Sequence, residues 1–166
     1  MANYYAAART NYVSLKEGLT VEDFRVHIDA IGLPSVEVIE KNGKVGLLSE
    51  DPDSGSFPSF LCPEWETEDD LKNLSQALGI PAEGLKDMEE IEFSWAAHIM
   101  PLVKEGEVFI VMESGAEKLR YIVGFAEAYV RQGDEVKFTS INITEIYSKA
   151  AVEFGIPVEQ IEPAEY

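Results

Sequence analysis

Apolar residues along the chain follow two different periods, which together predict a mixed α+β fold. After Thr20, apolar side chains recur at helical spacing until Gly32, and Pro34 follows, so residues 20–31 predict a helix. Three further segments show the same pattern and begin near Thr67, Asp87 and Thr144. The segment after Asp87 is predicted to run as a helix over 88–100 and to stop at Pro101.

Two-residue alternation predicts the strands. Residues 3–15 predict a first strand, and residues 36–40 and 45–49 predict a hairpin around Asn42-Gly43, a pair that favours a type I′ turn. A short strand is predicted at 57–61.

The stretch 107–141 contains three β-rich runs joined by two short Gly-containing connections, the pattern of a three-stranded meander. In its first run, Phe109 and Val111 are apolar on the face opposite Val108 and Met112, which predicts that this strand is covered on both sides. Gly124, inside the middle run, predicts a bulge or bend.

These elements predict a single α+β domain over residues 1–166. It would have an antiparallel sheet that ends in the meander, with helices 20–31 and 88–100 on one face. The predicted core consists of Phe24, Ile28, Val38, Leu47, Trp95, Ile99, Val108, Ile110, Tyr121, Val123, Phe125, Phe138 and Ile146.

The cysteine count and hydropathy predict the compartment. Cys62 is the one cysteine, so the chain forms no internal disulfide, and a packed thiol is the expected state. No apolar run reaches 18 residues, and the first residues lack the pattern of a secretory signal. We therefore expect a cytoplasmic protein.

Charge separates this chain from an average globular protein. Thirteen Lys and Arg oppose 31 Asp and Glu, for a net charge of −18. Such a surface repels nucleic acids and membranes, so we expect neither as a direct partner and expect a basic protein surface instead. The acids concentrate between Glu50 and Glu92, a stretch that overlaps an acidic helical segment predicted at about 62–100.

Three interpretations of this acidic segment remain open. It is a solubilising face, or a surface that imitates nucleic-acid phosphates, or a cation site. A calcium loop that began at Asp51 would end at Cys62, where an acid is required, and we predict no metal and no cofactor. The predicted partner-binding residues are Glu64, Glu66, Glu68, Asp69, Asp70, Glu89 and Glu90.

The sequence contains none of the common catalytic motifs, which favours a protein without enzymatic activity. His27 and His98 each precede an apolar helical residue and are predicted on helix flanks rather than in an active site. An alternative is a small-molecule-binding protein or enzyme built from the first strand and the loop at 113–120. Its candidate residues are Tyr4, Arg9, Tyr12, Glu113, Glu117, Lys118 and Arg120.

Three segments resemble a family of small acidic proteins of bacteria, phages and plasmids. They are N-Y-Y-A-A-A-R-T-N-Y at 3–12, P-S-F at 58–60 and G-E-V-F-I-V-M-E-S-G-A-E-K-L-R-Y-I-V-G-F-A at 106–126. The resemblance covers about half the chain, and residues 62–90 are longer and more acidic than the family pattern. Because the family has no assigned activity, the resemblance implies no catalytic residues. Its setting on mobile elements implies an inhibitor of host defence, of the anti-restriction or anti-CRISPR kind.

The sequence thus favours a non-enzymatic acidic interaction protein, in its sharpest form a DNA mimic that inhibits a defence nuclease or CRISPR complex.

Overall fold

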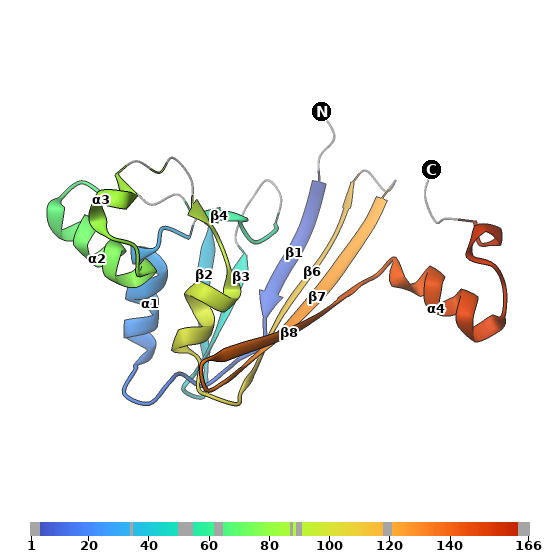
Figure 1. The fold of residues 1–166 in the computed structure, drawn as a ribbon, viewed down its shortest axis with the longest axis horizontal. Coiled ribbons are helices and arrows are strands. Elements are labelled where there is room, and N and C mark those ends of the chain that lie inside the picture. The colour runs from blue at the N-terminus through green and yellow to red at the C-terminus, as the bar shows by residue number, and fades with distance from the viewer. Residues whose placement is uncertain are drawn as a thin grey trace.

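A computed structural model describes residues 4–33, 35–49, 55–61, 65–86, 88, 91–117 and 121–162 of the chain. They form an α+β structure around a six-stranded antiparallel sheet with the strand order β2-β3-β1-β6-β7-β8 (Figure 1). The strands are β1 (Tyr4–Thr10), β2 (Val36–Lys41), β3 (Lys44–Ser49), β6 (Val108–Glu117), β7 (Tyr121–Gln132) and β8 (Glu135–Asn142). The predicted meander is confirmed as β6-β7-β8.

Helical elements lie on two sides of this sheet (Figure 1). One side carries α1 (Val21–Ala30), α2 (Glu68–Leu78), α3 (Ala82–Leu85), a π-helical turn η1 (Trp95–Ile99) and a 3₁₀ turn η2 (Met100–Leu102). On the other side, α4 (Glu145–Phe154) and the 3₁₀ turn η3 (Val158–Gln160) stand away from the sheet. A second, two-stranded sheet joins β4 (Phe60–Leu61) to β5 (Ile91–Glu92).

Local signals placed several elements correctly. Asn42 and Gly43 both have positive φ angles, as a type I′ turn requires, and β2 pairs with β3 across them. Thr20 caps α1, and Thr67 caps α2, each in a capping box with the acid three residues on. Gly79 ends α2 in the left-handed conformation.

The helix predicted at 88–100 is wrong. Ile91 belongs to β5, the Phe93 amide donates to the Ser59 carbonyl, and regular helical geometry is limited to the π turn that begins at Trp95. Ile91, Trp95 and Ile99 are buried as predicted, so the spacing identified the buried positions but not the backbone that presents them. Asp87, near which this helix was predicted to begin, lies outside the described residues.

The core lies between the sheet and α1, α2, η1 and η2. Six predicted core residues are confirmed as buried, and they are Phe24, Ile28, Val38, Leu47, Trp95 and Ile99. Five others are exposed, so the prediction was wrong for Val108, Val123, Phe125, Phe138 and Ile146. Ile110 is half-buried, and the side chain of Tyr121 lies outside the described part of the chain.

On β6 the prediction selected the wrong face. Phe109 and Val111 face the helices and are buried, whereas Val108 and Met112 face away from them and are exposed. Both sets are apolar, so the sequence alone did not distinguish them. Among the described residues, helices cover β6 on the side of Phe109 and leave Val108 and Met112 exposed, contrary to the predicted cover on both sides.

Gly124 does not form a bulge. The β6–β7 ladder runs without interruption from Val108 opposite Val130 to Glu117 opposite Tyr121, and it passes through Ser114 opposite Gly124.

No helix among the described residues combines the length and the apolar character that crossing a membrane requires.

Candidate interaction surfaces

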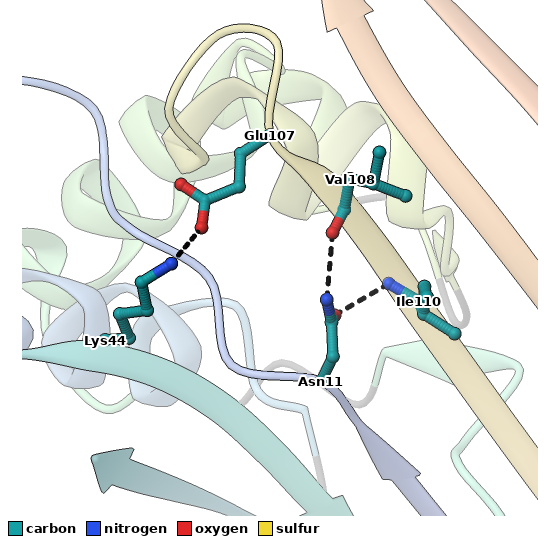
Figure 2. A network of polar contacts seen from close by, with 5 residues as sticks. All are labelled: Asn11, Lys44, Glu107, Val108 and Ile110. Carbon is teal, nitrogen blue, oxygen red and sulfur yellow. Dashed lines mark hydrogen bonds and ion pairs between the residues drawn. The ribbon is translucent and has the colours of Figure 1, made fainter. Parts of the chain in front are cut away.

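Thr10 and Asn11 join β1 to its neighbours β3 and β6 near the end of the backbone ladder. The Asn11 side chain donates to the Val108 carbonyl at 2.9 Å and accepts from the Ile110 amide at 2.8 Å (Figure 2). On the other side of β1, the buried Thr10 hydroxyl accepts from the Leu47 amide at 2.8 Å. These side chains replace ladder hydrogen bonds between β3, β1 and β6, so their role is structural.

Lys44 and Glu107 tie the β2–β3 hairpin to the start of β6. The ammonium Nζ lies 2.5 Å from Glu107 Oε1 (Figure 2). Partial burial alone would raise the pKa of Glu107, but hydrogen bonds from Lys44 and Ser14 outweigh it and lower the pKa.

The alternative small-molecule set is not gathered at one point. Arg9 follows Ala8 on β1, and Ala8 lies opposite Glu113, so the side chains of Arg9 and Glu113 extend from opposite faces of the sheet. Glu113 accepts from the Ser56 hydroxyl at 2.7 Å and thereby holds residues 56–57 against the sheet.

The other members of that set are spread or undescribed. Lys41 lies over the Tyr12 ring at 5.9 Å. Lys118 and Arg120 lie outside the described residues, as do the side chains of Tyr4 and Glu117. On the face that Arg9 occupies there is a shallow depression of about 260 Å³ between β3, β1 and β6.

The described part of the acidic segment surrounds the N-terminus of α2. Glu66, Glu68, Asp69 and Asp70 are all exposed there. Asp70 has a structural task, because its carboxylate accepts from the Thr67 hydroxyl at 2.7 Å and from the Thr67 amide at 3.0 Å. Those two hydrogen bonds lower its pKa.

The remaining three carboxylates have no such task. Among the described residues, Glu66, Glu68 and Asp69 form no ion pair, whereas Glu83 on α3 pairs with Lys86 at 3.3 Å. We call Glu66, Glu68 and Asp69 the acidic trio. Glu64, Glu89 and Glu90, also predicted for this surface, lie outside the described residues.

A groove of about 620 Å³ brings the two histidines together between α1, α2 and the η1–η2 segment. The His27 ring donates from Nε2 to the His98 carbonyl at 2.9 Å, and the His98 ring accepts the Ser94 amide at Nδ1 at 3.1 Å. His98 is buried and stacks on Phe93, so its predicted position on a helix flank is wrong.

Burial lowers the pKa of both histidines, and at His98 the neighbouring His27 lowers it further. Sequence reasoning missed this pair because the two residues are 71 positions apart. Within the described ranges, no three His, Cys, Asp or Glu side chains gather closely enough to hold a metal ion.

Sequence reasoning also missed a large apolar surface. None of the residues of α4 is buried, and Ile146 and Phe154 are exposed together with Ile143, Ile156 and Val158. We call residues 143–162 the C-terminal arm, and we call the side of the sheet opposite α1 and α2 the open face.

The chain was compared with family models, curated proteins and solved structures, and no match was found in any of the three. The resemblance to an acidic family of mobile elements therefore stays a prediction.

Proposed function

We propose that this protein is a non-enzymatic interaction protein that binds a basic protein surface through the acidic trio. The observation that carries the proposal is the exposure of Glu66, Glu68 and Asp69 at one helix end, without ion pairs among the described residues. The net charge of −18 adds a long-range attraction for cationic surfaces and speeds their encounter with the trio.

In its sharpest form the partner is a nucleic-acid-binding defence enzyme, either a restriction nuclease or a CRISPR complex. Such enzymes hold DNA in a positively charged channel, and DNA offers them one negative charge per about 1.7 Å of axis. Carboxylates at the start of α2 would compete for the same Lys and Arg side chains. The resemblance to proteins of mobile elements supports this choice of partner.

The positions of the other polar residues support a binding role over catalysis. Asn11 and Glu113 hold the chain together, and Asp70 caps α2. Arg9 and Glu113, which the alternative site needs side by side, extend from opposite faces of the sheet. We therefore favour the interaction protein over the small-molecule site.

The test is inhibition of DNA binding by a purified type I restriction enzyme and by a Cas9-type complex, each with its own DNA target. The wild-type protein is expected to displace DNA from at least one of them. A variant with Glu66→Lys, Glu68→Lys and Asp69→Lys is expected to lose about tenfold or more in potency, since three interfacial charges are reversed.

Asp70 is left unchanged in this variant because its loss would disturb α2. The matched control reverses Glu17, Glu37 and Glu40, three exposed acids outside the acidic segment, and gives the same change in net charge. Equal inhibition by the trio variant and by wild type would show that the acidic trio does not bind the partner. Failure of the wild type on both enzymes would exclude the nuclease-inhibitor form.

A further inference from the structure

The open face of the sheet is apolar at its centre, although it faces no helix of its own chain. Met112 is 57% exposed and Val108 46% exposed on β6, and Ile141 is exposed on β8. An antiparallel sheet that faces water normally alternates apolar and polar residues, with the polar ones outward. The strand β6 departs from this pattern, because it is apolar on the open face as well as on the buried one, whereas β8 keeps Glu135, Lys137 and Thr139 on the open face beside Ile141.

The open face of β6, and of β7 from 124 to 130, carries no charged residue, and charges lie on the neighbouring strands, with Arg9 on β1 opposite Met112 and Lys137 on β8 opposite Val130. The open-face residues of β6 are Val108, Ile110, Met112, Ser114 and Ala116, and those of β7 from 124 to 130 are Gly124, Ala126, Ala128 and Val130. None is charged, in a chain in which 27% of residues are. A surface without charge at the centre of an acidic protein is typical of the core of an interface.

The open face also has the shape to receive a helix. Across the strands, Met112 lies opposite Ala126, which lies opposite Ile141, and Ile110 lies opposite Ala128. The small side chain of Ala126 between Met112 and Ile141 is expected to leave a shallow groove along β7, and the Ile143 side chain lies against Gly124 at one end of it. From Gly124 to Ala128 this groove is about 13 Å long, and α4, with ten residues, is about 15 Å long.

The C-terminal arm supplies a helix that buries none of its residues in its own chain. Ile146, Ala150 and Phe154 follow one another at a spacing of four residues and form an apolar stripe, and Phe154 is 71% exposed. A ten-residue helix is marginal in water unless its apolar stripe packs against another surface.

Hydrogen bonds at the start of the arm direct it away from its own sheet. Asn142 Oδ1 accepts from the Thr144 amide at 3.0 Å and from the Thr144 hydroxyl at 2.9 Å. Glu145 Oε1 accepts from the Asn142 amide at 2.8 Å. With the turn held in this way, α4 extends away from the sheet (Figure 1) and is placed to reach a neighbouring molecule.

The exposed area is large enough for such a neighbour. The accessible surface is 11004 Å², whereas a compact monomer of 18.4 kDa exposes about 8,200 Å² by the usual scaling with mass. The difference is about 2,800 Å² per chain, or about 5,600 Å² for two chains, at the upper end of what obligate homodimers bury, about 2,000–5,000 Å² or more in total.

We propose that two copies of this chain form a dimer by exchange of their C-terminal arms. The apolar stripe of α4 in each copy lies in the groove along β7 of the other. A second copy fits because one chain carries both the helix and the groove, so a two-fold axis satisfies both at once. The proposal is independent of the acidic trio, which lies at the N-terminal end of α2.

The first experiment is sedimentation equilibrium on the full-length chain. The wild type is expected at about 37 kDa, twice the chain mass of 18.4 kDa. Met112→Asp on the open face and Phe154→Asp on the arm are each expected to raise the dimer dissociation constant about 30-fold or more. Phe138→Asp is the control, because Phe138 is 67% exposed but on the opposite face of the sheet.

A cysteine pair tests the exchange itself. With Cys62→Ser as background, a chain carrying Ala126→Cys and Ala150→Cys is expected to give disulfide-linked dimers on a non-reducing gel. A wild type that is monomeric at every concentration, or an internal disulfide within one chain, would overturn the proposal. So would a dimer that survives Met112→Asp and Phe154→Asp but dissociates with Phe138→Asp. Circular dichroism of each variant separates dissociation from unfolding.

Discussion

The Asn11 side chain accepts the Ile110 amide at 2.8 Å and so continues the pairing of β1 with β6 beyond the last backbone pair at Thr10. Asn11→Ala leaves the amide of Ile110 and the carbonyl of Val108 without these partners. We expect the free energy of unfolding to fall by about 1–3 kcal/mol, measured by urea denaturation. Asn73→Ala, an exposed amide on α2, is the control and is expected to change it by less than about 0.5 kcal/mol. Equal losses of unfolding free energy in Asn11→Ala and Asn73→Ala would contradict the role of Asn11 in joining β1 to β6.

Phe109 and Phe138 test which face of the meander supports the core. Phe109 is 1% exposed and packs against Trp95 with ring centroids 5.5 Å apart, whereas Phe138 is largely exposed. Phe109→Ala is expected to cost about 3–5 kcal/mol in urea denaturation, because it opens a cavity under the helices. Phe138→Ala is expected to cost less than about 1 kcal/mol. A larger loss at Phe138 would mean that the buried face of the meander is assigned incorrectly.

Asp69 and Asp70 are neighbours with the same charge and different tasks. Asp70→Ala removes the two hydrogen bonds that the Asp70 carboxylate accepts from Thr67, whereas the Asp69 side chain forms no hydrogen bond within the described part of the chain. Thermal unfolding followed by circular dichroism is expected to give a lower Tm for Asp70→Ala than for Asp69→Ala. The same Tm for both would show that the capping box contributes nothing.

The histidine pair predicts a loss of stability in mild acid. Burial lowers the pKa of His27 and of His98 in the folded chain. Below about pH 6.5, the usual histidine value, the unfolded chain therefore binds more protons than the folded chain. The free energy of unfolding is expected to be highest above this pH and to fall as the pH is lowered from 7.5 to 5.

His27→Gln checks the origin of this effect. Glutamine keeps an N–H donor for the His98 carbonyl but does not titrate, so the slope of stability against pH is expected to decrease. Asp23 and Asp70 also have lowered pKa values, but their ordinary value is 3.8, so their contribution is lost at lower pH than this window. An unchanged slope in His27→Gln would assign the pH dependence to other groups.

The sequence predicted those elements that depend on interactions within a few residues. Asn42-Gly43 specifies a hairpin because both residues tolerate positive φ, and Thr20 and Thr67 start helices because each faces an acid three residues on. For the same reason the acids near α2 were found as a group. The spacing of Thr67 and Asp70 matches that of Thr20 and Asp23, and it could have separated the capping acid from the acidic trio.

Contacts between segments far apart in the sequence decided the backbone of residues 91–99 and the position of the histidine groove. Residues 91–99 carry apolar side chains at helical spacing, yet pairing with β4 makes Ile91–Glu92 a strand and confines the helical turn to Trp95–Ile99. The histidine groove exists because α1 packs beside η1, which no local pattern encodes.

Val108 and Phe109 show what the sequence determines and what only the tertiary structure determines. Period-two alternation determined that these neighbours extend to opposite faces of β6, and both are apolar, so the sequence by itself determined a strand with two apolar faces. Only the tertiary structure decided which face the chain buries, because the helices are placed by their own packing against β2, β3 and one another. Burial is a property of what packs against a side chain, and among the described residues the helices that form the core pack only on the side of Phe109.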